Sequence, residues 1–108
     1  MAAININKQQ FEEMIRSEKP VLVDYWAPWC GYCRRIESAY EKVADSYGES
    51  LVVAKVNIDE NMLLTDQEEI EVIPTLVMYK NGDAIGSIVA PESKGMIEEF
   101  IRRTLGEV

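Results

Sequence analysis

The sequence predicts an α/β fold in which a central mixed sheet of five strands is flanked by four helices. Two nearly continuous apolar runs, 21–27 and 51–57, enclose a segment of helical periodicity at 33–48. This pattern is typical of a right-handed parallel βαβ unit whose strands are covered on both faces. Asn81-Gly82, placed between two further strand-like runs, predicts an antiparallel hairpin that makes the sheet mixed. We therefore expect helices on both faces of the sheet.

The N-terminal half begins with a short strand and a helix predicted over 8–18. Asn7 is a suitable N-cap for this helix, and Pro20 requires that it has ended. The first apolar run follows as a buried strand. The helix over 33–48 comes next, and Gly48 suits its C-cap. Apolar side chains recur on one face of both helices: Phe11, Met14 and Ile15 in the first, and Ile36, Tyr40, Val43, Ala44 and Tyr47 in the second.

The C-terminal half begins with the second apolar run, followed by a weaker helix over 60–70. Met62 and Leu63 are expected to point inward from that helix. The hairpin follows within 75–89, and a last helix is predicted over 93–105, with Gly106 just beyond its end. One face of the last helix is apolar, comprising Met96, Ile97, Phe100, Ile101 and Leu105.

Composition indicates one globular domain over residues 1–108. Hydrophobic residues make up 47% of the 108, and there is no repeat, linker or low-complexity tract. No run reaches the roughly 18 apolar residues of a membrane span, and the N-terminus lacks the pattern of a secretory signal. We therefore expect a cytoplasmic protein. The net charge of −8 argues against nucleic acid or an anionic membrane as a partner, and an acidic surface favours a monomer.

The chemistry of the chain centres on its two cysteines, Cys30 and Cys33. A structural metal site takes four N or S ligands, and because the chain has no histidine, such a site would need carboxylates or a second chain. A purely structural disulfide across two residues would constrain little chain. A reversible dithiol fits a C-x-x-C beside a βαβ pattern in a cytosolic protein, and it is the interpretation that we favour.

The position of the pair predicts how the two thiols divide the work. Cys30 falls at or just before the start of a helix, where free N–H groups and the helix dipole stabilise a thiolate. Such a site lowers a thiol pKa from about 8.5 into the range of ~3.5–7.5. Cys33 lies one turn further in and is more enclosed. Cys30 is thus predicted to attack and Cys33 to resolve the mixed disulfide.

Three segments, VLVDYWAPWCGYC, AKVNIDEN and IPTLVMYKNG, occur in an order and spacing that resemble the thioredoxin family over essentially the whole chain. The resemblance implies a thioredoxin-like fold and a thiol–disulfide oxidoreductase that reduces protein disulfides. It implies no bound cofactor and no metal. The implied partners are disulfide-containing client proteins and a separate thioredoxin reductase that recharges the pair.

The resemblance also implies roles for individual residues. Cys30 matches the nucleophile and Cys33 the resolving thiol. Asp24 matches a buried acid that exchanges a proton with the resolving thiol, and Lys55 matches the partner of that acid. From the residues alone, a carboxylate within an apolar strand is costly unless it has a partner or a task, although an exposed Asp24 at the strand edge stays open. Lys55 could equally extend its ammonium to the surface.

Five further residues match the surface on which the family holds its substrates: Trp29, Gly31, Tyr32, Ile73 and Pro74. Pro74 matches a cis-proline, and the backbone of the residue before it, Ile73, would pair with an extended substrate chain. Trp29 would form an apolar platform beside the thiol. Trp26 is expected in the core, close enough for its fluorescence to report the redox state.

The chain also departs from the family pattern. Tyr32 stands where proline is usual, which restores an N–H near Cys30 and is expected to make the couple more oxidising. Tyr32 also resembles the C-P-Y-C of glutaredoxins, so recharging by glutathione is one alternative, and oxidase or isomerase work is another. A thioredoxin-like binding module is a third. The other departures are Ser38, in the predicted 33–48 helix, and Val72, Ala90 and Pro91, around the expected substrate groove. In addition, Glu68, Glu69 and Glu71 make the approach to Ile73 acidic.

Overall fold

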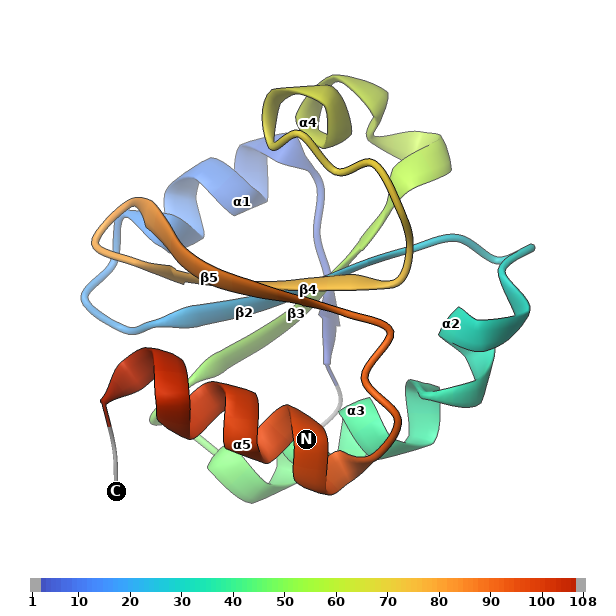
Figure 1. Cartoon of the computed structure of the whole chain (residues 1–108). Helices are drawn as coiled ribbons and strands as arrows, with labels where there is room; N and C mark the ends of the chain where they lie inside the picture. Colours follow the sequence, from blue (N-terminus) through green and yellow to red (C-terminus); the bar gives the residue numbers. More distant parts are fainter. Residues whose placement is uncertain (1–2, 107–108) are drawn as a thin grey trace.

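The computed structural model describes residues 3–106 and confirms the α/β fold with a five-stranded mixed sheet (Figure 1). The strands are β1 (Ile4–Asn5), β2 (Val21–Trp26), β3 (Val52–Asn57), β4 (Thr75–Lys80) and β5 (Asp83–Val89). The α-helices within 3–106 are α1 (Lys8–Ile15), α2 (Gly31–Arg35), α3 (Glu37–Tyr47), α4 (Met62–Gln67) and α5 (Lys94–Leu105), with a 3-10 helix at Ile58–Glu60. None of these helices is long and apolar enough to cross a membrane.

The strands lie in the order β1-β3-β2-β4-β5. Both β1 and β2 run parallel to β3, whereas β4 is antiparallel to its neighbours β2 and β5. The hairpin turn between β4 and β5 is the predicted one: Asn81 and Gly82 have φ angles of 55° and 85°, the left-handed pair that a two-residue hairpin loop requires. The predicted βαβ unit and hairpin are therefore both present.

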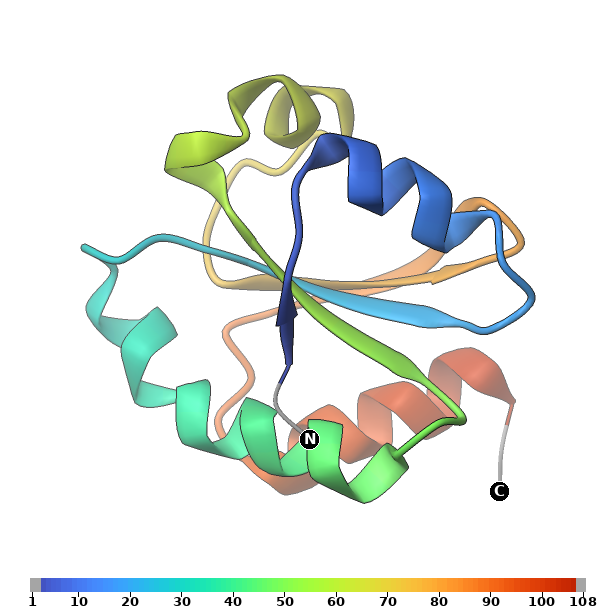
Figure 2. The same ribbon diagram turned by 180° about the vertical axis from the view of Figure 1, so that it is seen from behind.

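Helices cover both faces of the sheet, as the sequence predicts. Figures 1 and 2 show α1 and α4 on one face and α3 and α5 on the other, with α2 beyond one end of β2. The core on the α3 and α5 face includes Tyr40 and Phe100, both fully buried. The Tyr40 hydroxyl donates to the Leu22 carbonyl on β2 at 3.1 Å and to the Ala54 carbonyl on β3 at 2.6 Å. Helix α3 is thus fixed to β2 and β3.

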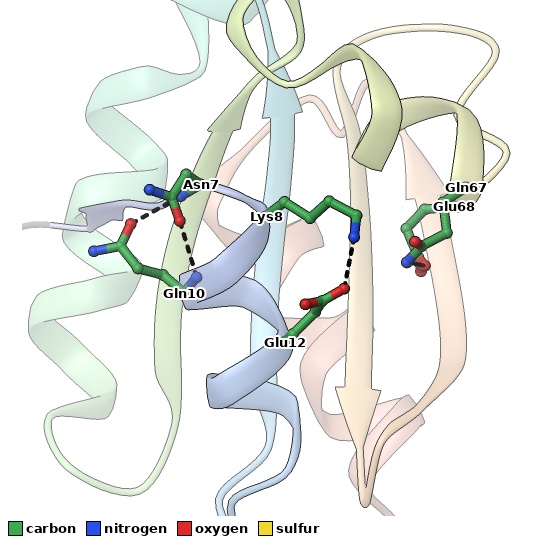
Figure 3. A network of polar contacts seen from close by, with 6 residues as sticks. All are labelled: Asn7, Lys8, Gln10, Glu12, Gln67 and Glu68. Carbon is green, nitrogen blue, oxygen red and sulfur yellow. Dashed lines mark hydrogen bonds and ion pairs between the residues drawn. The ribbon is translucent and has the colours of Figure 1, made fainter.

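Side-chain caps define the start of the first and last helices. The Asn7 side chain accepts from the Gln10 N–H at 2.9 Å, and the Gln10 side chain accepts from the Asn7 N–H at the same distance (Figure 3). This reciprocal capping box confirms Asn7 as the N-cap of α1. Ser93 caps α5, and Gly106 ends it in the left-handed conformation with a φ of 76°.

One predicted helix is two helices in the structure, so four predicted helices become five. The segment predicted as 33–48 begins earlier, at Gly31, and is interrupted at Ile36 between α2 and α3. The two helices pack against different clusters. Helix α2 contributes Cys33 of the disulfide to the small cluster at the site, whereas α3 packs on the sheet. A one-residue break leaves the apolar periodicity almost unchanged, so the sequence pattern did not reveal it.

The prediction for 60–70 was partly wrong. The segment 58–67 forms the 3-10 helix and the six-residue α4, in which Met62 and Leu63 are 69% and 77% exposed and Leu64 is fully buried. So short a helix has a single inward position, and the periodicity did not fix which residue takes it.

Candidate active site

The two cysteines form a disulfide just beyond the C-terminal end of β2, with their Cα atoms 5.3 Å apart. Cys30 is the N-cap of α2, and its sulfur accepts the Cys33 N–H at 3.1 Å. Cys30 is 8% exposed and Cys33 4% exposed, in the order that the sequence predicts. An N–H donor aimed at the Cys30 sulfur favours a negative charge there, which is the state in which sulfur attacks a disulfide.

Trp29, immediately before Cys30, is exposed yet held in place. Its side chain is 66% exposed, and its indole Nε1 donates to the Asp59 carboxylate, at 2.9 Å to the nearer oxygen. Asp59 lies in the 3-10 helix, which Asn57 caps by accepting from the Asp59 N–H. Sequence reasoning did not single out Asp59, which lies 30 residues from Trp29.

The structure places Ile73 beside the disulfide and joins it to Pro74 by a cis peptide bond. Ile73 packs against the small cluster formed by Ala27, Cys30 and Cys33, as do Trp26 and Tyr32. Gly31 is exposed in the first turn of α2. The residues predicted to hold substrate come from two separate segments of the chain, and the fold brings them together around the disulfide.

Tyr32 uses its hydroxyl group in a way that the sequence did not reveal. The hydroxyl donates to the carbonyl oxygens of Ala90 at 3.2 Å and Pro91 at 3.3 Å, in the loop between β5 and α5. Ala90 also donates its N–H to the Pro74 carbonyl at 2.9 Å and has a φ of 47°, which costs a non-glycine residue about 1–2 kcal/mol. The N–H that bonds the Cys30 sulfur is that of Cys33, not the Tyr32 N–H that the sequence led us to expect.

Asp24 lies in the middle of β2 and is 2% exposed, so the alternative of an exposed strand edge does not hold. Its Oδ1 atom is buried and has no hydrogen-bond partner in the part of the chain that the structure describes. Burial raises the pKa of Asp24 to about 7; the Lys55 charge opposes this rise and the Glu37 charge adds to it. A carboxyl with this pKa can take up and release a proton near neutral pH.

Lys55 faces Asp24 across β2 and β3, since the two residues are register partners in neighbouring parallel strands. The ion pair of its ammonium, however, is with Glu37 at the start of α3, at 3.0 Å. The ammonium also lies 4.6 Å from the centre of the Trp26 ring. Glu37 was not among the candidate residues. Its place four residues, or about one helical turn, after Cys33 was the available signal.

A groove borders the cis-proline segment. It lies between the 68–72 segment and the outer hairpin, and its lining includes Glu68, Glu69, Glu71, Val72, Ile85 and Val89. Val72 and Val89 are both more than half exposed. The acidic approach to Ile73 that the sequence predicts is therefore found next to an apolar surface.

No set of three histidine, cysteine, aspartate or glutamate side chains within residues 3–106 is arranged to hold a metal ion. The disulfide is the redox-active group of the site, because a dithiol can carry two electrons by itself.

Comparisons with known proteins agree with this geometry. The sequence model of the thioredoxin family matches residues 2–103. The chain is 42% identical to a thioredoxin of Acidithiobacillus ferridurans over 93% of its own length and 94% of that protein. It is 37% identical to a thioredoxin of Alicyclobacillus acidocaldarius over 90% and 92% of the two chains. A solved structure of Plasmodium falciparum thioredoxin superimposes with a TM-score of 0.86 at 29% identity, covering 94% of this chain and 98% of that one.

Proposed function

Because the chain belongs to the thioredoxin family, it is a thiol–disulfide oxidoreductase, and we propose that it reduces the disulfides of client proteins through Cys30 and Cys33. The observation that carries this proposal is the Cys30–Cys33 disulfide at the capped start of α2, between exposed Trp29 and the Ile73–Pro74 segment. The disulfide is the oxidised state that one turnover leaves behind.

In the first step the Cys30 thiolate attacks one sulfur of the client disulfide. The client S–S bond breaks, a Cys30–client disulfide forms, and the departing client thiolate takes a proton from solvent. The Cys33 N–H, 3.1 Å from the Cys30 sulfur, supports the attacking thiolate. Cys30 is the more exposed of the two residues, which supports its role as the nucleophile.

In the second step Cys33 loses its proton and attacks the Cys30 sulfur. The mixed disulfide breaks, the Cys30–Cys33 bond forms, and the second client thiolate departs and is protonated. Two electrons have then passed to the client. We assign the proton of Cys33 to the Asp24 carboxylate, a role supported by its burial and its pKa of about 7. Lys55 acts on this carboxylate by its charge and not by direct contact.

The client chain would lie across the surface formed by Trp29, Gly31, Tyr32, Ile73 and Pro74. Pairing with the Ile73 backbone would hold it extended, as in the addition of a strand, and the Trp29 indole would cover the reacting sulfurs. The Asp59 carboxylate, which accepts the indole N–H, keeps the indole in place before a client arrives.

The reaction needs no bound cofactor, since the electrons reside on the cysteines between turnovers. A separate thioredoxin reductase would return them, and the protein would act as a monomer in the cytoplasm. Tyr32 in place of proline raises two alternatives to this function, which are glutathione as the electron donor and a more oxidising role. The potential of the couple separates these alternatives.

A trapping experiment tests the proposed function. Cys33→Ser leaves the nucleophile but removes the resolving thiol, so a disulfide-bonded protein such as insulin should accumulate as a mixed disulfide on Cys30. Cys30→Ser should form none, and the unaltered chain should reduce insulin catalytically with dithiothreitol as donor. A mixed disulfide on Cys33 in the Cys30→Ser chain, with none on Cys30 in the Cys33→Ser chain, would reverse the assignment.

A redox titration against thiol buffers, followed by tryptophan fluorescence, then gives the direction of the reaction. A potential well below that of the glutathione pool supports a general reductant. A potential at or above it supports the glutathione-linked or oxidising alternative, with the same two cysteines.

A further inference from the structure

The buried carboxyl of Asp24 lies next to Lys55, but the ammonium group of Lys55 forms its ion pair with another carboxylate. Asp24 and Lys55 are register partners, and their side chains leave the same face of the sheet, because register partners on neighbouring strands point the same way. That face is the one covered by α3, since Leu22 and Val53, two residues before each, pack with Tyr40. The Lys55 side chain is 8% exposed. It is therefore placed to neutralise Asp24.

The ammonium group is nevertheless held by other partners. Glu37 Oε2 lies 3.0 Å from Lys55 Nζ, and the Trp26 ring centre lies 4.6 Å from it. The Glu37 side chain is 52% exposed, so this ion pair sits at the border of the solvent, whereas Asp24 Oδ1 remains buried without a partner. The carboxylates of Asp24 and Glu37 thus compete for the ammonium group of Lys55, and Glu37, the more exposed of the two, forms the ion pair.

We propose that Glu37 is a positioning residue for the dithiol reaction: by holding the Lys55 ammonium away from Asp24, it keeps the buried carboxyl able to accept the proton of Cys33 near neutral pH. This inference rests on the proposed role of Asp24. Glu37 touches neither the client nor the sulfurs and acts only through Lys55 and through its own charge.

Within residues 3–106, the charged and titratable groups that act on Asp24 come from one strand and one helix. Strand β3 contributes Lys55, and helix α3 contributes Glu37 and the Tyr40 hydroxyl. On β4 the register partner of Asp24 is the apolar Leu76. Removing the Glu37 charge has two effects of the same sign on the pKa of Asp24: it ends the repulsion between the two carboxylates, and it frees the ammonium to approach Asp24. Both lower the pKa.

The test is Glu37→Gln in the full chain, with the titration of the Asp24 carboxyl followed by carbon NMR in the oxidised protein. We expect its midpoint to fall by about 1 pH unit or more, the size of effect that an approaching opposite charge produces. Glu98→Gln is the matched control. It removes the same charge from the Lys94–Glu98 ion pair, which spans 3.2 Å on α5, and should leave the midpoint unchanged. An unchanged midpoint in Glu37→Gln overturns the proposal.

A double-variant comparison separates capture of the lysine from direct repulsion. In a Lys55→Met background, Glu37→Gln can remove only the repulsion, so its effect on the midpoint should be at most half of that in the unaltered background. An equal effect in both backgrounds overturns the proposal that Glu37 acts by holding Lys55. Because Glu37 is half exposed at the first position of α3, the glutamine variant should retain the fold.

The reaction itself supplies the second measurement. In the Glu37→Gln chain, the pH profile for release of the client from the mixed disulfide should move down with the Asp24 midpoint and by the same amount. A midpoint that moves while the profile stays overturns the proposal and the proton-accepting role of Asp24. The trapping of insulin on Cys30 in the Cys33→Ser chain is independent of both, so failure of the proposed function would be seen separately.

Discussion

The stability of an Asp24→Asn chain relative to the unaltered chain should increase as the pH rises. Folding takes this carboxyl from water into a site where it is 2% exposed, and its pKa rises from 3.8 to about 7. At about 1.4 kcal/mol for each pKa unit, ionised Asp24 costs the folded state about 4 kcal/mol. Against a total stability of roughly 5–15 kcal/mol for a typical domain, this cost is large.

The sign follows from which state holds the proton. Below pH 3.8 the carboxyl is protonated in both the folded and the unfolded chain, and the cost is absent. Between pH 3.8 and about 7 the folded state retains the proton that the unfolded state has lost, so stability falls as the pH rises. Above this range both states are ionised and the full cost is present. Asp24→Asn should therefore gain stability relative to the unaltered chain as the pH rises, and gain nothing more above pH 8.

Urea unfolding of the oxidised protein at pH 4, 6 and 8 measures this difference. The amide brings its own constant cost in a buried site, so the change with pH, and not the value at one pH, is the quantity predicted. Asp66→Asn, at an exposed position of α4, is the control and should show no such change. A stability difference between Asp24→Asn and the unaltered chain that is the same at pH 4 and pH 8 would refute the reasoning.

Three further substitutions test other contacts of the site. Tyr32→Phe removes the hydroxyl bonds to Ala90 and Pro91 and should cost about 0.5–1.5 kcal/mol in urea unfolding, while the redox potential, set by the retained backbone, stays unchanged. Asp59→Ala frees the Trp29 indole; its fluorescence anisotropy should fall, with stability altered by less than about 0.5 kcal/mol, and an unchanged anisotropy would contradict the role given to Asp59. Tyr40→Phe removes two buried bonds to strand carbonyls and should cost about 1–3 kcal/mol by thermal or urea unfolding.

The elements that the sequence predicted well are those with local signals. The Asn81-Gly82 turn needs two left-handed residues in succession, and this pair adopts them readily. The Asn7 cap and its partner Gln10 lie three residues apart. The break at Ile36 had no such signal, because the apolar face continues across it.

The active site divides in the same way. The position of Cys30 at the start of a helix follows from the helix pattern alone. The contacts of Trp29 with Asp59 and of Tyr32 with Ala90 join residues 30 and 58 positions apart, and nothing in either segment indicates the other. Lys55 shows a third kind of limit. Its place beside Asp24 follows from the strand register, but which of two nearby carboxylates its long side chain reaches depends on the tertiary structure.

The contacts of the active site extend beyond the C-x-x-C segment to the loop after β5. Ala90 is bonded on one side to the Pro74 carbonyl and on the other to the Tyr32 hydroxyl, so three remote stretches of chain share one residue. Replacing the dipeptide between the two cysteines would therefore also remove the hydroxyl contact that joins α2 to the loop after β5. A study of how that dipeptide sets the redox chemistry would therefore include Tyr32→Phe and Ala90→Gly as controls, which separate the loss of this contact from changes at the sulfur atoms.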